Sequence, residues 1–401
     1  IHESGELSEF LGGHSPGSSY DNWVSHVTEG IASDGFNDYG PDWLDVQTTG
    51  FGNYNKLEFG DPILSYWEDI FSSFILGDTT LVDSLLQDSI ESFYYELVVF
   101  EDTVYNQIFH IIREQLDTNF IDLNQSDNDL DDVVGSFRNG WGMYIINPQA
   151  TREQVVIQVP HPCDDFIAPY IAIDIFLETN AFAFMINGAG REVLWTEVGN
   201  YSNSKSLSDP SRYPNTIFQK FQEVAVHPLI GINPHWPLVF AIHSFDNESH
   251  EDRKSIIVAA GGQNSFTTKP IRDITDDHFD IINFTSEYPI DEGQFGNTNS
   301  LHVTDYYEVF YDDHCVFDNG ETEFPITLAT ELKGPSNGVQ MVDLQNLTSN
   351  FSVYEPWIHI ELDEKPMLFD SIGISNDSIY QNGSYPTGIQ NFTHIREYYQ
   401  P

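Results

Sequence analysis

Several short apolar segments after residue 140 limit the folds that are open to this chain. They are "VVIQV" at 155–159, "AFAFMI" at 181–186, "PLVFAI" at 237–242 and "SIIVAA" at 255–260. Strands that are apolar on both faces are typical of a sheet that helices cover on both sides. A helix-like segment, "IAPYIAIDIFLETN", separates the first two of them. We therefore expect an α/β fold, a three-layer mixed sheet with helices on both faces.

The first third of the chain has a different pattern. Residues 1–60 are rich in Gly, Ser, Asp and aromatics without periodicity, which predicts an irregular N-terminal arm. From Asp61 to about Leu116, apolar residues recur every three or four positions, which predicts helix. We thus expect three segments: the arm (1–60), a helical segment packed on the main domain (61–135), and an α/β domain (136–401).

Composition excludes several classes of partner. The net charge is −48, from 63 acidic and 15 basic residues. Such a surface repels nucleic acid and anionic membranes, so we expect neither as a partner. Aromatic residues make up 14% of the chain, which is more than a disordered chain would carry. No run of 18 apolar residues occurs, so we expect no membrane span.

Two features suggest secretion, and a third is compatible with it. The chain begins with Ile1 rather than Met, which we interpret as the result of signal-peptide removal. Two cysteines, Cys163 and Cys315, allow one internal disulfide, which an extracellular protein could keep. The sequence also contains glycosylation motifs of the form Asn-x-Ser/Thr, which predict a glycoprotein; they begin at Asn124, Asn200, Asn247, Asn283, Asn346, Asn350, Asn376, Asn382 and Asn391.

Polar side chains suited to metal chemistry follow or end several predicted strands. Ligands bind at the carboxyl ends of strands in open α/β sheets, so these positions are candidates for a site. "VVIQVP" leads into a histidine and two aspartates, "PLVFAI" leads into a histidine, and "WIHIEL" carries a glutamate. "AFMINGAGR" ends in an arginine. The candidate residues are His161, Asp164, Asp165, Arg191, His243 and Glu361.

These residue types fit a hydrolytic zinc site. Two neutral imidazoles and one carboxylate bind zinc and leave a fourth position for water, whose pKa the metal lowers to roughly 7. Only one of Asp164 and Asp165 is needed as a ligand, and the other could orient His161. A further carboxylate, Glu361, could take the proton of the water. The guanidinium of Arg191 could hold an oxyanion or a substrate carboxylate.

The order of these motifs resembles that of the zinc carboxypeptidase superfamily, including its N-formylglutamate amidohydrolase-like branch. The stretches that carry the resemblance are "VPHPCDD", "GAGR", "FAIHSFD" and "IHIELDE", spread over roughly residues 140–370. The resemblance implies zinc ligands at His161, at Asp164 or Asp165, and at His243. It also implies that Glu361 acts as general base and acid and that Arg191 acts as an electrostatic clamp. The sequence departs from the family in having Asp where Glu is usual.

Each residue also has a simpler interpretation. His161 could be a turn histidine, and the two aspartates could cap the following helix. His243 could be a buried histidine bonded to a backbone carbonyl. Glu361 could face solvent, and Arg191 could form an ordinary salt bridge.

Two functions follow. The first is a secreted zinc-dependent hydrolase of amide or peptide bonds, acting on a peptide or an acylated amino acid. The second is a glycosylated extracellular structural or self-assembling protein on a hydrolase-like fold whose site is lost or vestigial. In that case the arm at residues 1–60 could join subunits into a homo-oligomer.

Overall fold

The fold was determined from a computed structural model that describes residues 1–12, 54–88, 93–115, 137–162, 165, 168–190, 207–211, 213–230, 237–245, 256–259, 343–344, 347 and 357–363. Its strands are β1 (His2–Gly5), β2 (Tyr95–Asp102), β3 (Gln107–Glu114), β4 (Met143–Ile146), β5 (Arg152–Val159), β6 (Ala181–Ile186), β7 (Leu238–Phe245), β8 (Ile256–Ala259) and β9 (Trp357–Asp363). Its helices are α1 (Leu7–Gly12), α3 (Pro62–Ile75), α4 (Thr79–Asp88), α6 (Ala168–Glu178) and α7 (Ile217–Val226), which the short helix η3 (His227–Leu229) extends.

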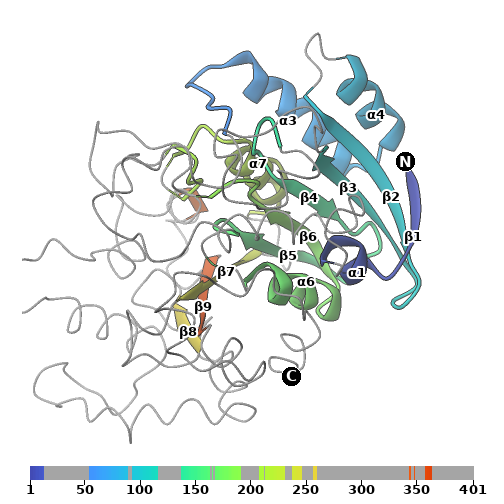
Figure 1. Cartoon of the computed structure of the whole chain (residues 1–401), viewed down its shortest axis with the longest axis vertical. Helices are drawn as coiled ribbons and strands as arrows, with labels where there is room; N and C mark the ends of the chain where they lie inside the picture. Colours follow the sequence, from blue (N-terminus) through green and yellow to red (C-terminus); the bar gives the residue numbers. More distant parts are fainter. Residues whose placement is uncertain are drawn as a thin grey trace, which may run out of the picture.

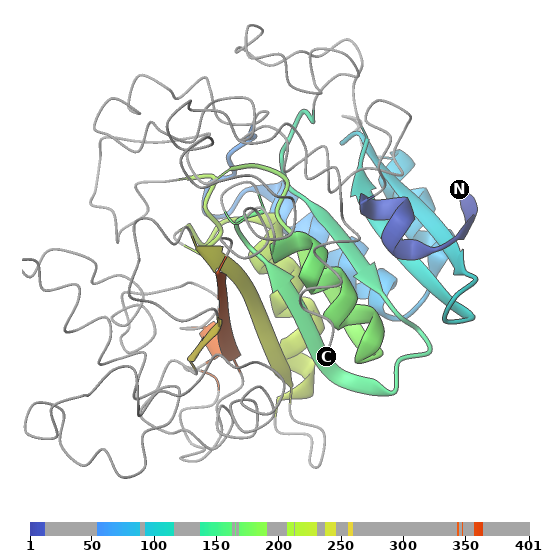
Figure 2. The ribbon, with the colours of Figure 1, turned by 60° about the horizontal axis from the view of Figure 1, so that its bottom comes forward.

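One mixed sheet contains all nine of these strands. Their order across the sheet is β1-β2-β3-β4-β6-β5-β7-β9-β8 (Figure 1). The central strands β6, β5, β7 and β9 are parallel neighbours, whereas β2, β3, β4 and β6 pair antiparallel. In Figure 2, β9 (dark red) lies beside β7 (olive), as their parallel pairing requires. The parallel part brings the carboxyl ends of β5, β7 and β9 to one edge.

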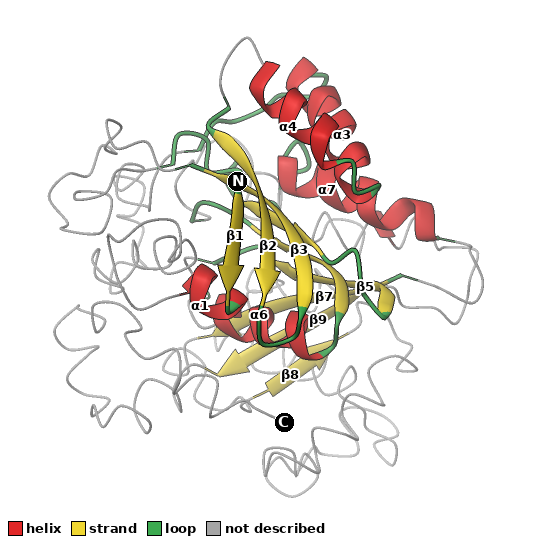
Figure 3. Ribbon diagram, turned by 90° about the vertical axis from the view of Figure 1, so that its right-hand side faces the viewer, coloured by secondary structure: helices red, strands yellow, loops and turns green. Residues whose placement is uncertain are grey.

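Helices cover both faces of the sheet, as the apolar strands predict. Helices α1 and α6 lie on one face, and α3, α4 and α7 lie on the other (Figure 3). On the first face, Phe109 of β3 packs against Phe176 of α6, with ring centroids 5.5 Å apart. On the second, Tyr144 of β4 contacts Phe71 of α3 at 4.8 Å and Phe221 of α7 at 4.9 Å. The predicted three-layer α/β fold is confirmed.

Helix α3 forms where the sequence predicts its start. The Asp61 side chain caps the helix by accepting a hydrogen bond from the Ile63 amide at 2.9 Å, and Pro62 occupies the first turn. The apolar stripe of the helix is fully buried, with Trp67 at the centre of an aromatic cluster. Trp67 meets Tyr95 edge-on at 4.7 Å and Trp141 at 6.1 Å. This helix therefore fixes the antiparallel half of the sheet.

The prediction of helix is wrong for residues 95–114. They form the antiparallel pair β2–β3, because apolar side chains on both faces of the hairpin are buried. Asp102 fixes its turn by accepting from the amides of Val104 and Tyr105. The other oxygen of this carboxylate accepts from the Leu7 amide at 2.7 Å and so begins α1.

The arm is also more regular at its start than predicted. Residues 2–5 form strand β1, which pairs parallel with β2, and α1 follows it directly. The sheet thus takes strands from each of the three predicted segments, and the boundaries at residues 60 and 135 stay a prediction. Strands β4 and β5 are consecutive along the chain, but β6 lies between them in the sheet. Within the described ranges, no helix is long and apolar enough to cross a membrane.

Two glycines with similar backbone angles provide a test of the packing at the end of β6. Gly142 has φ +93°, and a Cβ there would overlap the carbonyl oxygen of Ile186; Gly77 has φ +75° and open space around it. Gly77→Ala should cost about 1–2 kcal/mol, from backbone strain alone. Gly142→Ala should cost about 1–3 kcal/mol more because the added methyl overpacks the site. Urea unfolding measures both, and equal losses would contradict the close packing.

Candidate metal centre

Two adjacent parallel strands deliver two histidines to the same edge of the sheet. His161 lies two residues beyond the end of β5, directly after Pro160. His243 lies in the second half of β7. The strands pair in register from Val155 opposite Leu238 to Gln158 opposite Ala241. Because the pairing is parallel, both carboxyl ends point the same way. The two imidazole rings come within 4.9 Å, centroid to centroid.

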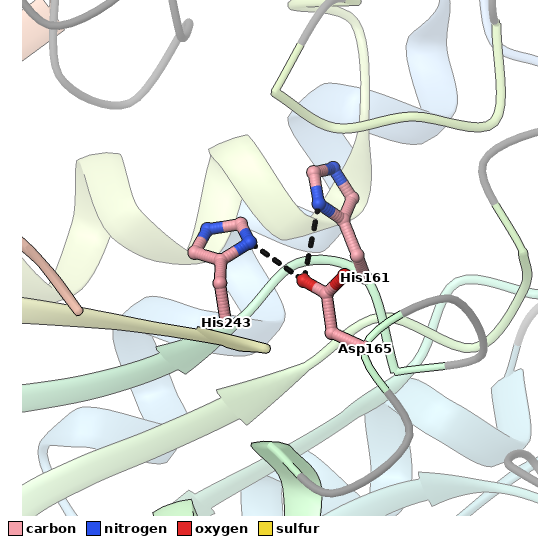
Figure 4. A group of neighbouring side chains, drawn as sticks. All are labelled: His161, Asp165 and His243. Carbon is pink, nitrogen blue, oxygen red and sulfur yellow. Dashed lines mark hydrogen bonds and ion pairs between the residues drawn. The ribbon is translucent and has the colours of Figure 1, made fainter. Parts of the chain in front are cut away.

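Asp165 completes the group. Its Oδ2 lies 2.7 Å from Nδ1 of His243 and 3.5 Å from Nδ1 of His161 (Figure 4). One ligand atom from each of the three residues lies within 4.8 Å of the others. The residues are only 7% (His161), 3% (Asp165) and 5% (His243) exposed. A buried carboxylate that faces two imidazole nitrogens is a donor set able to hold a metal ion.

A tight turn after β5 brings Asp165 back towards His161. The Asp165 amide donates to the carbonyl of His161 at 2.8 Å, and the amide of Ala168 donates to the carbonyl of Asp165 at 2.9 Å. The second bond leads into α6, whose first residue is Ala168. The spacing of four residues therefore places both side chains on one side of a single turn. The chain continues into a buried helix, which holds this turn against the sheet.

A second carboxylate fixes the ring of His161. Oδ1 of Asp209 lies 2.8 Å from Nε2 of His161, and the Ser211 amide donates to the same oxygen at 2.8 Å. Asp209 is 3% exposed, so water does not screen the contact. Nε2 is the ring nitrogen nearer to a carboxylate; with the proton on Nε2, the lone pair of Nδ1 points towards Asp165 and is the one that a metal ion would use. This is the arrangement that orients a metal-binding histidine and raises its basicity.

The sequence did not single out Asp209. It is one of 63 acids, and nothing in the segment "SDPSRY" sets it apart. Residues 207–211 lie far along the chain from His161, so only the folded structure brings the two together. Asn187, just after β6, helps to place this loop, since its side-chain amide donates to the carbonyl of Ser208 at 3.2 Å.

The simpler interpretations of His161 and His243 fit the structure less well. His243 is not held by a backbone carbonyl alone, because its Nδ1 contacts the carboxylate of Asp165. His161 is not an isolated turn histidine, because it lies between two carboxylates, Asp165 and Asp209. The structure therefore brings together three of the predicted residues, with Asp165 as the aspartate of the group.

The remaining predicted residues are not all placed. Asp164 and Arg191 lie outside the described residues, as do Cys163, Cys315 and the asparagines of the nine glycosylation motifs. The backbone of Glu361 is described: it lies in β9, paired directly opposite His243 of β7. This pairing puts Glu361 on the strand next to the centre, at the same level along the sheet.

No protein-family model, curated protein or solved structure matches the chain. The geometry of the centre is thus the basis for any functional conclusion.

The centre should bind a divalent metal through its two histidines. His161→Ala and His243→Ala should each lower the zinc retained after dialysis from about one ion per chain to near zero, because two ligands do not hold a structural or catalytic zinc. Elemental analysis of the purified protein measures this. A matched control is His227→Ala, since His227 also contacts a carboxylate (Asp343, 2.6 Å) but lies elsewhere. Zinc loss in the control as well would contradict the assignment.

The Asp209 contact should tune this affinity. Asp209→Asn keeps the shape of the side chain but removes its charge, and should weaken zinc binding about 10–100-fold. Competition with a chromophoric chelator measures the change. An unchanged affinity would show that the ring of His161 is oriented by other groups.

Proposed function

We propose that this protein is a zinc-dependent hydrolase of amide or peptide bonds, whose substrate is a peptide or an acylated amino acid. The observation that carries the proposal is the convergence of His161, Asp165 and His243 at the carboxyl ends of two parallel strands. This edge of an α/β sheet is where ligands and catalytic groups are usually found. The proposal also draws on the resemblance to zinc carboxypeptidases in the order of the sequence motifs.

The donor set favours zinc among the common metals. Imidazole nitrogens suit zinc, whereas calcium and magnesium prefer sites made only of oxygen ligands. Three protein ligands also leave a position for water, as in catalytic rather than structural zinc sites. A zinc ion held there would supply the Lewis acidity that makes a water molecule nucleophilic near neutral pH and polarises a carbonyl.

Side chains of the protein would orient the ligands, transfer the proton and bind the substrate. Asp209 holds the ring of His161 so that Nδ1 is available as a ligand. Glu361, opposite His243 in the pairing of β7 and β9, is the proposed base that takes a proton from water and passes it to the leaving amine. Arg191 is the proposed clamp for an oxyanion or a substrate carboxylate. Adjacent strands lie about 4.8 Å apart, which keeps Glu361 within reach of the centre.

We further propose that the protein works outside the cell. Nine glycosylation motifs and a net charge of −48 support this assignment. A strongly acidic surface stays soluble in saline media and does not adsorb to nucleic acid.

Glu361 gives the sharpest test of the hydrolase. Glu361→Gln should leave the zinc content unchanged and lower kcat/KM about 10²–10⁴-fold, because a positioned general base contributes that much to a proton-transfer step. The assay is amine release from a panel of N-acyl amino acids and C-terminally free peptides. Glu153→Gln, at the exposed start of β5, is the control and should keep full activity. A zinc-loaded wild type that hydrolyses none of the panel would favour the non-enzymatic alternative instead.

A further inference from the structure

A buried acid lies at the end of β3, on the face of the sheet that α3 covers. The Glu114 side chain is completely inaccessible to solvent. Its Oε1 accepts hydrogen bonds from the backbone amide of Asn139 at 2.5 Å and from the side-chain amide of the same residue at 2.9 Å. Its Oε2 accepts from the Trp141 amide at 3.3 Å. The carboxyl thus binds the loop at residues 137–142, which leads into β4.

Burial has the largest effect on the electrostatics of this carboxyl. Burial raises the pKa of Glu114 to about 8, although the amides of the loop favour the charged form and lower the pKa in part. Among the described residues, two tyrosines interact with it: Tyr95 of β2 and Tyr144 of β4. The one arginine of the loop, Arg138, stacks over the ring of Tyr94 with its guanidinium 4.5 Å from the centroid.

A neutral carboxyl fits the hydrogen bonds around it. The hydroxyl of Tyr95 donates to the carbonyl of Gly142 at 2.9 Å, so its oxygen is free to accept a hydrogen bond from Glu114, with which it interacts. In the neutral form, Oε1 of Glu114 accepts from Asn139, and Oε2 carries the proton towards Tyr95 while one of its lone pairs accepts from the Trp141 amide.

One route of hydrogen bonds leads from this loop to the metal centre. Asn55 binds Asn139 through backbone and side chain, at 2.9 and 3.1 Å. Two residues later, the carbonyl of Leu57 accepts from the hydroxyl of Tyr213 at 2.7 Å. The amide of Tyr213 in turn donates to the carbonyl of Asp209 at 2.9 Å. The backbone of the residue that orients His161 is therefore tied to the loop that Glu114 holds.

A second route is a direct backbone contact. Gly142 lies so close to the carbonyl of Ile186 that no side chain would fit between them, and Gly188 lies against Gly142 in the same way. Between these positions, the side chain of Asn187 donates to the carbonyl of Ser208, which precedes Asp209. The two routes run through different segments, and both end in the loop at residues 207–211, which contains Asp209.

We propose that Glu114 is a positioning residue for the metal centre: its hydrogen bonds fix the loop at residues 137–142, and through that loop it holds Asp209 against His161. The role rests on the proposed metal-dependent function, although its structural part can be tested without metal.

This role predicts a loss of order as the pH rises towards 8. The pKa of Glu114 in the folded protein is about 8, against 4.5 for an unperturbed carboxyl. Its contribution to stability is therefore complete below the ordinary value, falls as the pH rises between the two values, and is lost above about 8. Opening of the loop at residues 137–142 exposes the carboxyl to water, where it ionises, so rising pH favours the open loop over that interval.

Two substitutions separate the effects of hydrogen bonding and charge. Glu114→Gln keeps an acceptor for Asn139 and a donor for Tyr95, as in the neutral acid, but cannot ionise. Glu114→Met keeps the length but loses both functions. Leu97→Ala is the control for lost stability alone. Leu97 is buried in β2 on the same face of the sheet as Tyr95 and Glu114, and its apolar side chain makes no hydrogen bond to the loop.

The first experiment is hydrogen–deuterium exchange of the metal-free proteins between pH 6 and 9.5, expressed as protection relative to the intrinsic rates. In the wild type, protection of segments 137–142 and 207–211 should fall together, by about tenfold or more, as the pH rises from 6 to about 8, and should level off above that value. Glu114→Gln should keep its protection throughout, and Glu114→Met should lack it in both segments at every pH. If Glu114→Met loosens 137–142 but leaves 207–211 protected, the coupling is refuted. A flat wild-type profile would refute the role of the neutral form.

The second experiment measures zinc affinity by chelator competition at pH 7 and pH 9. Glu114→Met should bind zinc about 10–100-fold more weakly than Leu97→Ala, as expected when the group that orients a ligand is lost. Equal affinities of these two variants would overturn the proposal. If the wild type binds no zinc at all, the proposed hydrolase fails, while the exchange experiment still decides the role of Glu114.

Discussion

The parallel pairing of β5 with β7 is the constraint on which the candidate centre depends. Parallel neighbours send their carboxyl ends to one edge, so His161 and His243 meet although 81 residues separate them along the chain. The pairing in turn depends on strands that are apolar on both faces, since a parallel sheet is stable only when helices cover both of its sides. The layers formed by α6 and α7 therefore stabilise the sheet and position the centre.

The polar residues of the centre are buried, and each of them contacts the next. Asp209 faces one nitrogen of His161, the other nitrogen faces Asp165, and Asp165 faces His243. Charges and imidazoles are retained in a protein interior only when each has a partner, because the loss of hydration is otherwise too costly. This requirement explains why four polar residues lie together behind a largely apolar sheet. The same requirement explains why the carboxylate of Asp209 lies beside His161, next to the group that could hold a metal ion.

The antiparallel half of the sheet supports this centre from a distance. Its aromatic core, around Trp67 and Tyr144, holds strands β2 to β4 under α3. The loop at residues 137–142 connects that core to the end of β6 and to the segment beside Asp209. A change far from the candidate metal ligands can therefore act on them through hydrogen bonds and backbone contacts rather than through charge alone.

The sequence by itself determined the α/β class, most strands after residue 140, the start of α3, and the choice of His161, His243 and an aspartate at 164–165, because burial and strand ends leave local patterns. It failed at residues 95–114, where a pattern with a helical period is overridden by pairing with distant strands. Only the tertiary structure decided that Asp165 faces both histidines, that Asp209 contacts His161, and that Glu114 is buried against the loop at residues 137–142. These facts are contacts between segments far apart in the chain, and a linear pattern of residue types does not specify such contacts.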